Sequence, residues 1–172
     1  MDVMEAIRAR YSCRAYLDKP VEKEKLDKVI EAARLAPSAK NLQDWRFVVV
    51  TDRQAKQRLA EAASNQMFLA DAGAILVACS VSDHVMRCGQ CVGPIDVAIA
   101  VEHICLEAVE LGLATCWIGS FDADRVRRLL GIPPHVALIE LLALGHPAEP
   151  WRQPRREPPE KIVCFETWDF PG

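Results

Sequence analysis

The sequence has 172 residues, of which 51% are hydrophobic and 26% are charged, and its formal net charge is −3. This balance is typical of a folded domain and excludes an intrinsically disordered chain. The acidic balance also argues against a nucleic-acid-binding protein, which would carry a clustered basic surface. We expect one domain over residues 1–172, in which the proline-rich segment 146–172 forms an extended arm.

We expect no membrane span and no secretion signal. Acidic side chains occupy positions 2 and 5, where a signal peptide would have a basic region. Uncharged runs such as residues 72–82 are far shorter than a membrane span. The seven irregularly spaced cysteines are typical of buried or incidental thiols in a reducing compartment. The sequence therefore predicts a cytoplasmic protein.

Hydrophobic periodicity predicts helices and strands along the whole chain. The first helix is expected over residues 2–9, and the second carries the amphipathic spacing Leu26, Val29, Ile30 and Ala33 and ends at Pro37. Further helices are expected over residues 53–63, 94–111 and 122–131, and strands over 47–51, 74–79, 114–119, 136–144 and 162–165.

Two of these elements have unusual surroundings. The segment 94–111 is apolar on almost all sides, so we expect it to be central or to lie in a subunit interface. The strand at 162–165 has no evident partner in the same chain. The predicted fold class is α+β, close to α/β, with a central mixed β-sheet flanked by helices.

A cluster of arginines near the start of the chain favours an anion site. Arg8, Arg10, Ser12 and Arg14 lie within seven residues. Guanidinium groups bind phosphate oxygens in pairs, and a serine hydroxyl adds a donor. Surface ion pairs are the plainer interpretation, which composition alone favours. Because neither a GxGxxG nor a Walker motif occurs, a nucleotide would have to be held by such side chains.

Two loops have the composition of a binding surface. The stretch PSAKNLQDW, residues 37–45, is rich in hydrogen-bonding side chains and contains no glycine. In the stretch GLATCWIGSFD, residues 112–122, a strand ends at Gly119 and Ser120 and leaves backbone N–H groups free for a flat heterocycle. Either loop alone is also compatible with an ordinary turn.

The order of these motifs resembles the nitroreductase family of FMN-dependent oxidoreductases. The resemblance extends from about Met4 to Phe165 and rests on five stretches in the family order: RARYSCRAY, APSAKNLQDW, IDVAIAVEHICLEAVELGLATCWIGSF, LLALGHPAE and RREPPEKIV. It implies a nitroreductase-type fold in an intertwined homodimer with exchanged C-terminal arms. It also implies FMN at the interface, NADH or NADPH as co-substrate, and ping-pong hydride transfer to nitroaromatics, quinones or similar small acceptors.

The resemblance also implies which residues hold FMN. Arg10 and Ser12 would bind the phosphate, Arg156 would close on it, and Arg14 would reach the ribityl and pyrimidine side. The loop of residues 37–41 would come from the other subunit. Backbone near Gly119 and Ser120 would face flavin N5, so no side chain is expected to be catalytic. The full implied set is Arg10, Tyr11, Ser12, Arg14, Pro37, Ser38, Ala39, Asn41, Gln66, Trp117, Ile118, Gly119, Arg155 and Arg156.

The chain departs from the family pattern at two positions. Asp44 stands where the family usually has proline, so this loop is either less rigid or presents the carboxylate to the substrate. Leu69 lies where larger members carry polar flavin-contacting residues, a role that Asn65 or Gln66 would take over.

Other interpretations remain open on the sequence alone. The pair Cys88 and Cys91 has the spacing of a metal site or a redox dithiol, but no second CxxC accompanies it, and incidental thiols are favoured. The alternatives to a nitroreductase are a specialised flavin enzyme of the same fold, a flavin-binding protein without turnover, and a metal-binding regulatory protein.

Overall fold

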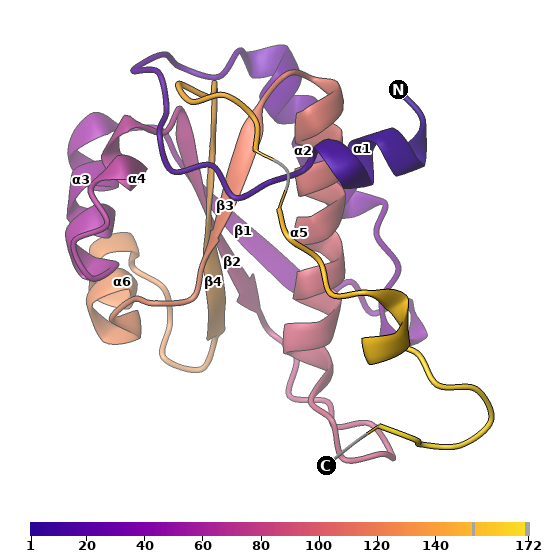
Figure 1. Ribbon diagram of the computed structural model, residues 1–172. Helices are drawn as coiled ribbons and strands as arrows, with labels where there is room; N and C mark the ends of the chain where they lie inside the picture. The colour runs from indigo at the N-terminus through magenta and orange to yellow at the C-terminus, as the bar shows by residue number, and fades with distance from the viewer. Residues whose placement is uncertain (153, 171–172) are drawn as a thin grey trace.

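A computed structural model describes residues 1–152 and 154–170 of the chain, in which one β-sheet lies between two layers of helices (Figure 1). The helices are α1 (Val3–Ala9), α2 (Lys23–Arg34), α3 (Arg53–Ala62), α4 (Phe68–Asp71), α5 (Val92–Glu110) and α6 (Ala123–Leu130), with the 3₁₀ turns η1 (Ala39–Asn41) and η2 (Pro159–Lys161). The strands are β1 (Trp45–Val50), β2 (Ala74–Ser80), β3 (Ala114–Ile118) and β4 (Ala137–Gly145).

The sheet has the strand order β1-β2-β4-β3, and neighbouring strands are antiparallel throughout. The expected α+β class is confirmed. The expected mixed character is limited to one isolated parallel bridge, between Ser12 and Thr115, in the part of the chain that the structure describes. The central strand β2 is buried along its whole length, as its continuous apolar sequence predicted.

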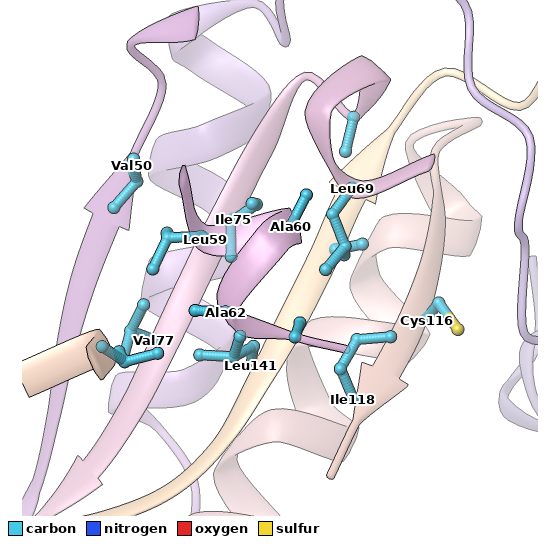
Figure 2. Close-up of a cluster of buried hydrophobic side chains, with 14 of the residues drawn as sticks. Val50, Leu59, Ala60, Ala62, Leu69, Ile75, Val77, Cys116, Ile118 and Leu141 are labelled. Carbon is cyan, nitrogen blue, oxygen red and sulfur yellow. The ribbon is translucent and has the colours of Figure 1, made fainter. Parts of the chain in front are cut away.

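A hydrophobic cluster covers each face of the sheet. Helices α3, α4 and α6 pack on one face over residues such as Leu59, Leu69, Ile75 and Leu141 (Figure 2). Helices α2 and α5 pack on the other face, where Val97, Val101 and Ile104 meet Leu76, Leu142 and Leu144. The short helix α4 was not predicted, and its Leu69 is fully buried, so this side chain belongs to the core rather than to a ligand site.

The predicted apolar helix of residues 94–111 is confirmed as α5, which contacts all four strands. It ends where Gly112 adopts φ +70, a left-handed conformation that glycine takes without steric strain. The chain then reverses directly into β3, so the end of α5 determines where β3 lies. No helix among the described residues is long and apolar enough to cross a membrane.

The predicted strand at residues 162–165 is wrong for the single chain. These residues follow η2 and form no strand in the described range of the arm. The side chains of Ile162, Val163 and Phe165 are largely exposed, Phe165 to 84%. The apolar, β-branched sequence that suggested a strand is present, but the chain offers it no neighbouring strand to pair with.

One buried carboxyl group lacks a hydrogen-bond partner. Glu140 lies on β4 opposite Ala78 and is 6% exposed. Its Oε1 atom has no partner among the residues that the structure describes. Burial, with a smaller contribution from the charge of Glu102, raises the pKa of Glu140 to about 8.

This raised pKa predicts a pH dependence of stability. Between the ordinary glutamate value of about 4.3 and about 8, the folded chain holds a proton at Glu140 that the unfolded chain has lost. The free energy of unfolding should therefore fall as pH rises, by up to about 1.4 kcal/mol per pH unit for one proton. We expect Glu140→Gln to be increasingly more stable than the wild type from pH 5 to pH 8 in urea denaturation.

The exposed Glu24 provides the control, because Glu24→Gln alters a solvated carboxylate on α2. Its stability difference from the wild type should change little with pH. A Glu140→Gln difference that is constant over the same pH range would contradict the buried-carboxyl explanation.

Candidate functional site

The arginine-rich segment lies between strand β3 and the C-terminal arm. On one side, the Cys13 N–H donates to the Thr115 carbonyl at 2.9 Å, beside the parallel bridge at Ser12. On the other side, the Ala148 N–H donates to the Ala15 carbonyl at 2.8 Å. A third backbone bond, from Leu17 to His146 at 2.9 Å, extends this pairing. The segment therefore has a fixed position although it lies outside the named strands.

This arrangement creates a hollow of about 430 Å³ with a largely cationic lining. The lining residues are Arg10, Tyr11, Ser12, Arg14, Glu149, Arg152, Pro154 and Arg156. Five residues of the predicted set thus come together, although they are separated by more than 130 positions in the sequence. Four guanidinium groups and two hydroxyl groups share the lining with a single carboxylate, which is the chemistry of an anion site.

Two side chains of the hollow are held by neighbouring elements. The Arg10 Nε atom lies 3.3 Å from a carboxylate oxygen of Glu102 on α5. The Tyr11 hydroxyl donates to the Glu149 carbonyl at 3.3 Å, and burial raises the pKa of Tyr11, so this hydroxyl keeps its proton. The exposed Arg14 has only a long contact, 3.4 Å, from its guanidinium to the Ser12 carbonyl. The Arg14 side chain is therefore less restrained than that of Arg10.

Sequence reasoning missed three residues of the hollow: Glu149, Arg152 and Pro154. The Glu149 carboxylate accepts the backbone N–H of Arg14 at 2.9 Å, which joins the arm to the arginine segment. No local pattern predicts this bond, because its two residues are 135 positions apart. Of the two expected arm arginines, Arg156 lines the hollow, whereas the exposed Arg155 is not among the lining residues.

The end of β3 presents backbone rather than side chains. The Ile118 side chain is buried in the core, and the Trp117 indole N–H donates to Cys105 Sγ on α5 at 3.2 Å. At Gly119, a Cβ atom would meet nothing within 4 Å, so open space adjoins this backbone. The backbone at this end of β3 is therefore accessible to a flat ligand.

The predicted Gln66 lies against the same turn. Its side-chain amide donates to the Ala63 carbonyl at 3.0 Å and to the Ser120 carbonyl at 3.4 Å. The hydroxyls of Ser64 and Ser120 are 3.0 Å apart. These contacts place Gln66 beside residues 117–120, as a partner of that backbone.

The loop of residues 37–43 belongs to a separate place in the fold. It lies at the start of α5, where the Ala39 N–H donates to the Asp96 carboxylate. None of Pro37, Ser38, Ala39 or Asn41 is among the residues that line the arginine hollow. Within one chain the loop residues therefore stand apart from the predicted residues that line the hollow.

The cysteine loop has no metal-binding geometry. Residues 85–91 form a small hairpin, with a bridge from Val85 to Cys91 and a bond from the Met86 N–H to the Gln90 carbonyl at 2.9 Å. Cys88 and Cys91 are both exposed thiols. Over residues 1–152 and 154–170, no group of three or more His, Cys, Asp or Glu side chains could hold a metal ion.

Comparisons with known proteins identify the family of the chain. The Nitroreductase family model matches residues 7–92 and 65–146. The chain belongs to the nitroreductase family. It is 35% identical to the NADH dehydrogenase of Thermus thermophilus over 96% of both chains, and 30% identical to the FMN reductase [NAD(P)H] of Bacillus subtilis over 97% of this chain and 74% of that one. The crystal structure of a nitroreductase family protein from Clostridium difficile superposes with a TM-score of 0.88 at 34% identity, over 98% and 100% of the two chains.

The nitroreductase fold of this chain is thus established by sequence and by structure, and the chain is an oxidoreductase of that family. The arginine hollow lies within this fold and is formed by the first fifteen residues and the arm. Its lining includes one carboxylate, Glu149, whose negative charge would weaken the binding of an anion.

A charge-neutral replacement of Glu149 tests the electrostatics of the hollow. Glu149→Gln keeps an acceptor for the Arg14 N–H but removes the negative charge. Unit charges about 4 Å apart interact by about 1 kcal/mol in water, so inorganic phosphate should bind about two- to five-fold more tightly at low salt. A titration followed by NMR shifts of the arginine segment measures this affinity. Glu160→Gln, on the exposed η2, should have no effect, and equal or weaker phosphate binding by Glu149→Gln would contradict the assignment.

Proposed function

We propose that this nitroreductase family member uses FMN and NADH or NADPH to reduce nitroaromatics, quinones or similar small acceptors. The observation that carries the proposal is the cationic hollow, in which Arg10, Ser12, Arg14 and Arg156 come together. The Bacillus subtilis relative is an FMN reductase [NAD(P)H] and the Thermus thermophilus relative is an NADH dehydrogenase, which supports a flavin and a nicotinamide as the reacting pair.

The residues of the chain fit FMN in two respects. A phosphate monoester carries about two negative charges near neutral pH, which suits several guanidinium groups and a hydroxyl. The isoalloxazine ring is flat, and the open space beside Gly119 adjoins exposed backbone that can hydrogen-bond its edge. The parallel bridge between Ser12 and Thr115 joins the two places, because β3 runs from Thr115 to the turn at Gly119.

The chain has a binding role in the reaction rather than a covalent one. A bound flavin would supply the redox chemistry, taking a hydride from the nicotinamide and giving it to the acceptor in a later step. Arg14, as a cation beside the ring, would favour negative charge on it. Backbone N–H groups near Gly119 and Ser120 would orient the reactive edge. The Ile118 side chain is buried and the Trp117 indole is bonded to Cys105, so neither side chain is free to turn toward the ring.

A homodimer would complete the site. In one chain the loop of residues 37–43 lies apart from the hollow, although the family resemblance assigns both to the same FMN site. The exposed apolar side chains of the arm, Ile162, Val163 and Phe165, are suited to cover a second copy of the chain. We therefore propose that each loop lines the site of the partner subunit. The free cysteines fit a cytoplasmic location.

The replacement Arg10→Ala tests the phosphate assignment. It removes a charge-assisted contact of about 1.5–3 kcal/mol, so the FMN dissociation constant should rise ten-fold or more. Quenching of flavin fluorescence measures this constant, and Arg53→Ala, an exposed arginine on α3, is the matched control. Anaerobic NADPH and NADH should bleach the flavin absorption of the wild type. Stoichiometric FMN that neither nucleotide reduces would instead indicate a flavin-binding protein without turnover.

Mixed dimers test whether the two groups of residues meet across an interface. A dimer of one Arg10→Ala chain and one Asn41→Ala chain would contain one site with both defects and one intact site. We expect each variant alone to bind FMN weakly and the mixed dimer, isolated with two affinity tags, to bind one FMN per dimer with wild-type affinity. If no site regains this affinity, the loop and the hollow act within the same chain.

A further inference from the structure

Asp96 is a buried carboxylate whose only recorded hydrogen-bond donor is a loop amide. It lies in the second turn of α5 and is 4% exposed. Both of its carboxylate oxygens accept from the Ala39 N–H, at 3.2 and 3.1 Å, and no other donor to them is found among the described residues. Burying a carboxylate costs free energy unless it is hydrogen-bonded, so loss of the bond from Ala39 would be unfavourable.

The loop that Asp96 holds is conformationally strained. Lys40, Asn41 and Gln43 adopt φ values of 51°, 55° and 54°, in the left-handed region that side chains with a Cβ disfavour. Each such residue costs of the order of 1–2 kcal/mol, so the loop needs external contacts to keep this shape.

Three kinds of contact hold the loop. The Ser38 hydroxyl accepts the Gln43 N–H at 3.0 Å, and the Arg46 guanidinium donates to the Gln43 carbonyl at 3.1 Å. The first contact lies within the loop, and the second joins the end of the loop to Arg46 at the start of β1. The bond from Ala39 to Asp96 spans 57 positions and ties the loop to the central helix. Asp96 therefore anchors the first half of the loop to α5, whereas Arg46 anchors its end to β1.

We propose that Asp96 is a positioning residue that presents Ser38 and Asn41 to the FMN site of the partner subunit. This inference rests on the proposed function, because it takes the loop to be part of that site.

Hydrogen exchange of the FMN-free protein tests the positioning step. In Asp96→Ala, the amides of residues 39–43 should exchange at least ten-fold faster than in the wild type. Asp96→Asn keeps a neutral acceptor for the Ala39 N–H and should give an intermediate rate. Asp71→Asn, which alters an exposed carboxylate at the end of α4, is the control and should leave these rates unchanged. Unchanged exchange in Asp96→Ala would overturn the proposal.

Flavin affinity tests the second step. We expect the FMN dissociation constant to rise about ten-fold in Asp96→Ala and by less in Asp96→Asn, with the dimer intact by sedimentation. If the loop exchanges faster but FMN affinity is unchanged, the proposed role of Asp96 is wrong. The proposed function would still be supported by weaker FMN binding in Arg10→Ala. A wild type that takes up no FMN would overturn both.

Mixed dimers distinguish positioning from general destabilisation. If Asp96 acts only through its loop, Asp96→Ala should behave like Asn41→Ala. It should regain one wild-type site when paired with Arg10→Ala, and none when paired with Asn41→Ala. A dimer with Arg10→Ala that regains no site would mean that Asp96 acts on its own subunit, which would overturn the proposal.

Discussion

Helix α5 is buried against all four strands, and both groups of candidate site residues are attached to it. Its second turn carries Asp96, which binds the loop of residues 37–43. Its middle carries Glu102, which lies beside Arg10, and Cys105, which receives the Trp117 indole N–H. Because a close-packed helix cannot shift without disturbing the core on its whole length, these contacts keep fixed distances from one another.

The second organising feature is the short pairing between the arginine segment and the arm. The backbone bonds of Ala15 and Leu17 to the arm bring the far end of the sequence back over its beginning. Arg156 owes its place in the hollow to this return, and so do the residues that sequence reasoning did not find. The anion site is thus a consequence of chain topology as much as of arginine content.

The elements that sequence reasoning predicted are those with a strong local signal. The apolar run of β2, the almost uniformly apolar α5 and the glycine at position 112 each encode their structure within a few residues. The cluster around Arg10 and Ser12 was found for the same reason, because arginine density and a neighbouring hydroxyl are visible in the sequence itself.

What could not be predicted depends on contacts between distant positions. In the sequence, Glu149 is an ordinary acidic residue, and only the structure shows its bond to the Arg14 N–H. Asp96 is likewise one polar residue on an apolar helix until its bond to Ala39 is known. The strand expected at residues 162–165 failed for the complementary reason, since a strand needs a neighbour and local sequence does not say whether one exists. The backbone carbonyl of Asp44 accepts the Val81 N–H at 3.0 Å, a contact between distant positions that proline would also provide.

The inward orientation of Trp117 and Ile118 has a consequence for how such a fold diversifies. Backbone N–H and C=O groups are nearly the same for every residue type. This strand end can therefore keep its backbone geometry while its side chains are selected for core packing. The side chains that can vary without disturbing the core are exposed ones elsewhere, such as those of residues 40–43. The sequence of this surface loop can therefore change while the packing of the strand end stays constant.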